Sequence, residues 1–418
     1  MDINIVSAML YSMALVLVAL SIAFVLLLLK IFTGKSLRTS KYPPVHGTVF
    51  GQIIYFSRLY DYQTGVARRS PTFRLLAPDQ SEIYTVDTRN VEHILKTKFE
   101  EYTKGEYNID IAKDLFGEGI FAVDGDKWRK QRKVASFEFA TRVLRDFSCC
   151  VFRKNAAKLV KVVEELSAAS EIFDMQNDKE DILSRFLLES EKDPENMNDK
   201  YLRDVILNFM IAGKDTSANT LSWFLYMLCK HPLVQQKIFD EIKEVIGDQV
   251  SEANADYFVE KITDLVLDRM YYLHATLTET LRLYPAVPAD GRCAEADDVL
   301  PDGFHVKKGD GVYFLAYSMG RMHNIWGEDA EDFKPERWLK DGIFQNESPF
   351  KFVAFNAGPR ICLGKDFAYR QMKIVSIALL RFFRFRLADE TRPVTYKVMF
   401  TLHIDNGLHL HAVPRLAA

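Results

Sequence analysis

The most chemically specific stretch of this 418-residue chain is FNAGPRICLG, in which Cys362 follows a Gly-Pro turn and precedes a predicted long helix. A sulfur there lies near free backbone N–H groups and the positive end of a helix, and both favour a thiolate. Gly358 and Gly364 permit close approach of a bulky planar group, Phe355 can pack against that group, and Arg360 offers a fork for a carboxylate. The alternative is a buried cysteine at a helix N-terminus with no ligand.

This stretch resembles the haem-binding loop of the cytochrome P450 monooxygenases, Phe-x-x-Gly-x-Arg-x-Cys-x-Gly. Five fixed positions arise by chance in about one sequence of this length in ten thousand, taking ~20 equally common residues per position. The resemblance implies the P450 fold, haem b (iron protoporphyrin IX) with Cys362 as its iron ligand, O2, and electrons from NADPH through a reductase flavoprotein.

A second family motif, Glu-x-x-Arg, is matched by Glu279 and Arg282, and the Pro-Glu-Arg-Trp stretch downstream supplies Arg337. A lone Glu-x-x-Arg is expected about once by chance in a chain this long, and would then be a minor contact on a helix surface. In the family these three residues form a buried network that braces the cysteine loop. We therefore expect structural roles for Glu279, Arg282 and Arg337.

The predicted helix Asp199–Lys230 contains AGKDTS, which resembles the helix that faces the haem iron in the family. Small Ala212 and Gly213 let a flat cofactor and dioxygen approach the backbone, and an acid beside an alcohol, Asp215 and Thr216, can relay protons. For an isolated mid-helix Thr-Ser pair, simple bonding back to the preceding turn is the commoner explanation. With the cysteine loop present, the relay is favoured.

Haem carries two propionates, so cationic partners are required. By resemblance to the family, Trp128 and Arg132 of the WRKQR stretch, together with Arg292 and Arg360, would contact them.

The same stretch is rich in charge, with five basic residues within seven positions from Lys127 to Lys133. A solvated helix face is the default interpretation of such a run. By family resemblance, its exposed members would dock an acidic reductase.

The residues after Cys362 and the Leu-Ser-Trp after Thr216 resemble the plant clan that contains fatty-acid ω-hydroxylases. Under that hypothesis Ile211, Ala212, Val287 and Ala289 line an apolar channel that presents the terminal methyl of a long chain to the iron. The resemblance thus implies a lipophilic small-molecule substrate.

Composition agrees with an ordered protein, because 48% of residues are hydrophobic, 27% are charged and the net charge is −3. Disorder and binding to nucleic acid are both disfavoured. The five cysteines form no Cys-x-x-Cys pair or regular framework, which argues against a disulfide scaffold or a structural zinc site and indicates a reducing compartment.

The 27 residues from Ile3 to Leu29 carry no charge, and a helix of that length reaches about 40 Å, enough to cross a bilayer. A cleaved signal peptide is the alternative, but the run is long and no basic segment precedes it. Basic residues follow the run, so we expect a single-pass anchor with the rest of the chain cytoplasmic, at the endoplasmic reticulum membrane. The expected division is an anchor at 1–32, a proline-containing connector at 33–47 and a haem-binding monooxygenase domain at 48–418.

The remaining pattern predicts a mostly α (α+β) domain with small β-sheets near both ends. Phe73–Leu76 and Ile83–Val86 read as a hairpin, and a second hairpin signal, Asp-Asn-Gly at 405–407, follows the β-rich stretch Val394–Ile404. Helices are predicted over Val91–Lys96, Asp126–Arg145, Val151–Ala168, Asp178–Glu189, Asp199–Lys230, Leu233–Val245, Tyr271–Leu283 and Lys365–Arg384.

The chain departs from the family between Arg145 and Asp199, where 53 intervening residues leave room for about three average helices. The family carries more helices there, including a pair that roofs the substrate channel, and the pattern jumps near residues 176–177. We therefore expect an internal segment to be missing. The alternatives to an active monooxygenase are a haem-binding but catalytically impaired truncated isoform and a hydroperoxide rearrangement enzyme, which Asp215-Thr216 argues against.

Overall fold

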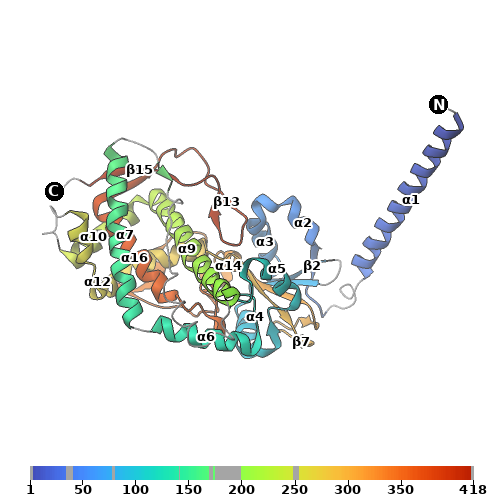
Figure 1. Ribbon diagram of the computed structural model, residues 1–418, viewed down its shortest axis with the longest axis horizontal. Coiled ribbons are helices and arrows are strands. Elements are labelled where there is room, and N and C mark those ends of the chain that lie inside the picture. Colours follow the sequence, from blue (N-terminus) through green and yellow to red (C-terminus); the bar gives the residue numbers. More distant parts are fainter. Residues whose placement is uncertain are drawn as a thin grey trace.

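The computed structural model describes residues 3–33, 41–77, 81–140, 142–168, 173–174, 199–247 and 254–415 (Figure 1). Predicted helix 178–189 and the expected junction near 176–177 lie outside these residues. The helices are α1 Ile3–Thr33, α2 Val49–Ile54, α3 Leu59–Ala67, α4 Thr88–Glu92, α5 Glu106–Phe116, α6 Gly125–Ala140, α7 Arg142–Ala168, α9 Asp199–Lys230, α10 Pro232–Ile246, α11 Ala255–Glu260, α12 Asp264–Arg269, α13 Tyr271–Leu283, α14 Ala316–Met319, α15 His323–Trp326 and α16 Lys365–Phe382.

The strands are short, as expected for a mostly helical α+β domain. They are β1 Val45–Thr48, β2 Thr72–Leu76, β3 Ser81–Thr85, β4 Tyr102–Thr103, β5 Phe173–Asp174, β6 Asp290–Ala294, β7 Asp298–Val299, β8 His305–Val306, β9 Gly311–Phe314, β10 Leu339–Lys340, β11 Ile343–Phe344, β12 Phe383–Leu387, β13 Tyr396–Lys397, β14 His403–Ile404 and β15 His409–Pro414. The remaining elements are a π-helix at His93–Thr97 (η2) and 3₁₀ helices at Phe56–Arg58 (η1), Phe99–Glu101 (η3), Pro335–Trp338 (η5) and Gly358–Arg360 (η6).

The helical half of the molecule is built around α9 and α16. Helix α16 packs against α7, α9, α10 and α13, and Figure 1 shows the long α9 running through the middle of the body. The buried side chains between these helices are large and apolar, including Trp223, Leu228, Ile377 and Leu380. Removing this much apolar surface from water stabilises the arrangement at roughly 25 cal/mol per Å². The Cys362 loop, which leads directly into α16, is thereby placed on a rigid support.

The other half is a six-stranded mixed sheet with the order β1-β2-β3-β9-β6-β4. Strands β2 and β3 pair antiparallel with Phe73 opposite Tyr84, which confirms the predicted hairpin. The segment that carries β6 and β9 returns from far along the sequence to pair with these strands. Arg292 on β6 therefore lies in the same sheet as the N-terminal strands β1, β2 and β3.

The second predicted hairpin is wrong in its pairing. Asn406 and Gly407 adopt the positive φ values of a tight turn, 59° and 74°. However, β14 pairs with β13, whereas β15 pairs with β12 and β5. The turn signal was thus correct locally, but the strands on either side belong to different sheets, because pairing is decided by which strand offers a buried face.

Two helices match their predicted bounds in full, Asp199–Lys230 and Tyr271–Leu283, and α10 and α16 agree within two residues at each end. The predicted helices 126–145 and 151–168 are divided differently, because α6 ends at Ala140 and α7 begins at Arg142. Helix α5 was missed.

Helix α1 stands apart from the body in Figure 1, and its stretch Met9–Leu28 is long and apolar enough to cross a bilayer, with a mean hydropathy of 2.6 and no burial against the rest of the chain. The connector is fastened to the sheet by Arg74, whose Nε donates to Pro43 O at 3.0 Å and whose backbone N–H donates to Pro44 O at 2.9 Å. The expected connector at 33–47 overlaps β1, since the strand begins at Val45.

Candidate functional site

The loop that carries Cys362 folds back on itself before α16 begins. The backbone N–H of Cys362 donates to Phe355 O at 2.8 Å. The thiol is exposed, yet desolvation by the surrounding protein raises its pKa; the Gly364 N–H and the charges of Arg132 and Lys365 lower it by less. The backbone N–H and the nearby cations thus favour a thiolate, as expected, but desolvation of the sulfur outweighs them. Cys362 is therefore an exposed sulfur whose negative form a bound cation would stabilise.

The two glycines of the motif have different roles. Gly358 has φ +63°, and a Cβ added to it would lie 1.9 Å from Leu95 O in η2. It is therefore required for packing of the loop against protein, rather than against a planar group. At Gly364 an added Cβ would make ordinary contacts, 3.7 Å from Phe139 and 4.0 Å from the Cys362 sulfur. Gly364 thus lies directly beside the thiol.

Behind the loop, the structure brings Glu279, Arg282 and Arg337 together. Glu279 accepts two hydrogen bonds from Arg282, each 2.8 Å long, and lies 3.5 Å from Arg337 Nε. Trp338 Nε1 and the backbone N–H of Lys334 also donate to Glu279, at 2.8 and 2.9 Å. Both Glu279 and Arg282 are buried. The buried Glu279 carboxylate therefore accepts hydrogen bonds on both of its oxygens, and its charge is compensated by Arg282.

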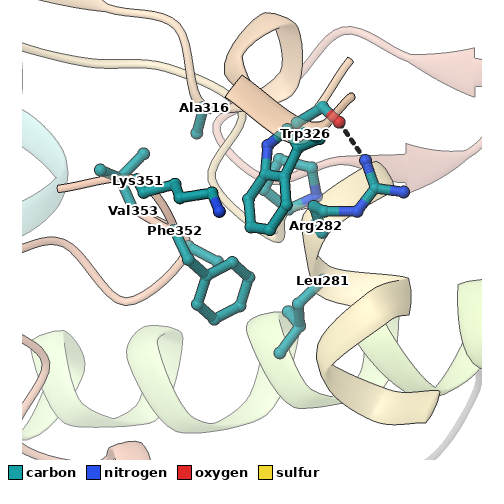
Figure 2. Close-up of a pocket in the computed structure, with 10 residues that line it drawn as sticks. Leu281, Arg282, Ala316, Trp326, Lys351, Phe352 and Val353 are labelled. Atoms are coloured by element: carbon teal, nitrogen blue, oxygen red, sulfur yellow. Dashed lines mark hydrogen bonds between the residues drawn. The ribbon is translucent and has the colours of Figure 1, made fainter. Parts of the chain in front are cut away.

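Figure 2 shows how this network meets the segment before the cysteine loop. The Trp326 ring lies between Arg282, whose guanidinium is 5.2 Å from the ring centroid, and Lys351, whose Nζ is 4.4 Å away. The space that these residues share with Phe352 and Val353 is only about 10 Å³, so packing is tight. The centroid of the Phe352 ring lies 5.1 Å from that of Trp338 and 6.4 Å from that of Phe355. The network is thus joined to the cysteine loop through aromatic side chains.

On α9, Thr216 makes the bond back to the preceding turn that is common for a mid-helix threonine, with Oγ1 donating to Ala212 O at 2.5 Å. The helix is continuous over its whole length. Asp215 is half-buried, and its negative charge acts on His403, whose pKa is nevertheless lowered because desolvation dominates. The acid and the alcohol are therefore consecutive residues of α9 whose side chains are both half-buried.

Phe139 at the end of α6 ties α9 to the cysteine side of the site. Its ring centroid lies 5.7 Å from that of Phe209 on α9 and 6.0 Å from that of Phe367 on α16. Because the same ring is the nearest contact of Gly364, three elements meet beside the thiol. No feature of the sequence singled out Phe139.

The cations expected to meet propionates lie in one charged cluster. Arg360 pairs with Asp124 and its guanidinium is 4.4 Å from the centroid of the buried Trp128 ring. Arg132 lies near enough to Cys362 for its charge to act on the thiol. Arg292 is fully buried and pairs with Asp290 at 2.9 Å.

The sequence analysis did not predict several other members of this charged cluster. Lys104 Nζ lies 3.1 Å from Asp290, Asn356 Nδ2 donates to Asp290 at 2.9 Å, and the Lys104 N–H donates to Asp124 at 2.8 Å. These residues come from separate segments of the sequence, so no spacing reveals them.

Arg292 provides the test of whether an anionic cofactor fits here. Its Nε and Nη2 are buried and have no hydrogen-bond partner in the described chain. Buried donors without a partner cost free energy, about 1–3 kcal/mol each and more when charged. A carboxylate placed before them would remove that cost, so the residues fit a group such as haem that brings two propionates.

The expected channel residues come from two segments, Ile211 and Ala212 from α9 and Val287 and Ala289 from the stretch before β6. All four are half-buried, and Ala289 packs against the core of the six-stranded sheet.

The comparisons with known proteins point to one family. The cytochrome P450 family model matches residues 170–411. Cytochrome P450 704C1 of Pinus taeda is 45% identical, over 90% of this chain and 93% of that protein. Cytochrome P450 704B1 of Arabidopsis thaliana is 36% identical over 87% and 93% of the two chains, and cytochrome P450 86B1 of the same plant is 31% identical over 85% and 82%.

Proposed function

This chain belongs to the cytochrome P450 family, and from that premise we propose that it is a membrane-anchored haem-thiolate monooxygenase that hydroxylates long-chain fatty acids at the ω position. Proteins of the family are oxidoreductases that use haem, O2 and electrons from a reductase. The observation that carries the proposal for this chain is the Cys362 loop, with its exposed thiol and the cationic cluster beside it.

In this proposal Cys362 supplies the sulfur ligand, and Arg132, Arg292 and Arg360 hold the propionates with help from Trp128. Small Ala212 and Gly213 would leave room for the flat cofactor, Phe355 would pack against it, and Gly364, which lies beside the Cys362 sulfur, would let it approach closely. When bound, haem activates O2 with electrons from the reductase, and its thiolate ligand favours cleavage of the O–O bond. The protein itself would hold the cofactor, orient the substrate and deliver protons.

Asp215 and Thr216 are the proposed route for protons. Thr216 Oγ1 donates to Ala212 O in the resting chain, so the hydroxyl can pass a proton only if that bond opens. Asp215 is the adjacent group that can resupply it from the partly solvated side.

Replacing Thr216 by alanine should lower the rate of hydroxylation by on the order of 10²-fold, because proton delivery contributes about that much. The spectrum of the carbon monoxide complex should not change. Product formation in single-substrate assays with a reductase and NADPH measures the effect. Thr220→Ala is the matched control, since Thr220 makes the same kind of bond one turn later, to Thr216 O at 2.7 Å. A Thr216→Ala rate equal to that of Thr220→Ala would exclude the relay.

A lipophilic substrate follows from the family, and the long-chain fatty acid is our proposal, supported by the plant relatives and by the apolar character of Ile211, Ala212, Val287 and Ala289. Such a lining gives shape and no polar handle near the reacting carbon. A fatty-acid chain would meet these requirements with its methyl end foremost.

The apolar helix α1 supports attachment to a membrane as a single-pass anchor, and we propose the endoplasmic reticulum, with the domain 48–418 on the cytoplasmic side. The exposed basic residues of α6 would meet the reductase. Lys127 and Arg129 pair with exposed acidic side chains, Glu118 and Glu100, which a partner's acidic groups would replace.

We also propose that this chain lacks an internal segment that its relatives carry. The alignment to the pine protein runs over 481 positions, whereas 90% of 418 residues is about 376, so about 105 residues of that protein stand opposite gaps in this chain. This difference supports the second candidate function, a haem-binding but catalytically impaired truncated isoform.

One experiment separates the two candidates. The full chain is expressed with its anchor, reduced under carbon monoxide, and assayed on long-chain fatty acids with a reductase and NADPH. A chimaera with the pine protein's extra residues inserted between 176 and 177 is assayed in parallel. Turnover by the unaltered chain supports the monooxygenase. A normal carbon monoxide band with turnover only in the chimaera selects the impaired isoform, and the absence of the band excludes both.

A further inference from the structure

Lys104 stands where β4 leads into α5, at the edge of the charged cluster beside the cysteine loop. Its ammonium group lies 3.1 Å from Asp290 Oδ1, and only 20% of its side chain is exposed. Asp290 is shared, because its other oxygen accepts from Arg292 at 2.9 Å and from Asn356 at 2.9 Å. The only carboxylate within hydrogen-bonding distance of the Lys104 ammonium in the described residues is therefore Asp290, which it shares with Arg292.

The charges of this cluster do not balance. Lys104, Arg292 and Arg360 are linked by hydrogen bonds to Asp290 and Asp124, and the charge of Arg132 also acts on Arg360. These four cations meet two carboxylates. The two positive charges left over equal the charge of the two propionates of haem b.

The surroundings of Lys104 disfavour an ammonium group with so little compensation. Desolvation, followed by the charge of Arg292, lowers the pKa of Lys104 to about 8, although Asp290 opposes this. A second carboxylate would stabilise the ammonium in a place where water does so only partly. The unpartnered Nε and Nη2 of Arg292, in the same cluster, show that the acceptor is missing on this side.

We propose that Lys104 is a further propionate ligand, which donates to a haem carboxylate while Asp290 holds it beside Arg292. The inference rests on haem binding at Cys362, which is part of the proposed function, and is independent of the substrate. No sequence motif identifies Lys104, and the proposal gives it a measurable role, which is retention of the cofactor.

The test compares rates of haem loss from the full chain to an excess of apomyoglobin. Lys104→Met should release haem about 10-fold faster than the wild-type chain, as expected for loss of one charge-assisted hydrogen bond worth ~1.5 kcal/mol. Lys104→Arg should release it at close to the wild-type rate. The matched control is Lys113→Met, the same substitution at an exposed site on α5, which should have no effect.

Reconstitution with haem dimethyl ester separates a propionate contact from a purely structural role. With both carboxylates esterified, the wild-type chain and Lys104→Met should lose the cofactor at the same rate. Equal rates with native haem would overturn the inference, and so would a difference that persists with the ester. If the wild-type chain holds no haem, the proposed function fails as well; if it holds haem but does not hydroxylate fatty acids, only the substrate assignment fails.

Discussion

Replacing Cys362 by serine should abolish the carbon monoxide difference band of a thiolate-ligated haem. A serine hydroxyl stays protonated at neutral pH and is a poor ligand for iron, whereas a cysteine sulfur loses its proton on binding a metal. The Cys362 thiol is exposed in a loop held by Phe355 O, so the substitution removes one atom's chemistry and leaves the backbone contacts in place.

Cys150→Ser is the control for this experiment, because Cys150 is also exposed but lies on α7. It should leave the band unchanged. Haem content should fall less than the band in Cys362→Ser, because the cationic cluster still offers partners to the propionates. A band of unchanged position in the Cys362→Ser chain would place the iron ligand on another residue.

Replacing Glu279 by glutamine should lower the free energy of unfolding by about 3–5 kcal/mol, and with it the yield of folded, haem-binding protein. The carboxylate accepts from Arg282, Trp338 and the Lys334 backbone, and glutamine would turn an N–H₂ group toward these donors. Removing one partner of a buried ion pair costs about 3–5 kcal/mol, which is a large part of the ~5–15 kcal/mol that stabilises a typical domain. Soluble yield, thermal midpoint and haem content measure the loss.

Two further variants make the result interpretable. Arg337→Lys should cost less than Glu279→Gln, because Arg337 lies 3.5 Å from Glu279 and bonds mainly to Asp329 and Trp326 O. Glu347→Gln breaks an exposed pair with Lys351 and should change stability by less than about 1 kcal/mol. A Glu279→Gln chain as stable as Glu347→Gln would show that the buried network does not support the fold.

Local chemistry explains which elements the sequence predicted correctly. Helix α9 ends where His231 and Pro232 follow Lys230, and α16 begins directly after the glycine of the cysteine motif, so their bounds are written in neighbouring residues. Helix α5 was missed although it ends at Gly117, whose φ of +54° is typical of a residue that follows a helix. Asp204 of α9 lies where a side chain at position 117 would be, so the packing also requires glycine there.

The site divides in the same way. Cys362, the Glu279–Arg282 pair and the Asp215-Thr216 pair are encoded by short spacings, so sequence could name them. The Phe139 bridge and the desolvation that raises the pKa of the Cys362 thiol depend on which elements pack together.

The sequence by itself therefore determined the family and named the proposed iron ligand, because thiolate ligation needs one residue in a loop of fixed local geometry. Only the tertiary structure decided the cationic cluster, in which Lys104 and Asp124 meet Asp290 and Asn356 from much later in the chain. Electrostatic interactions act through space and are strongest where water is excluded, and neither distance nor burial is visible in the order of residues along the chain.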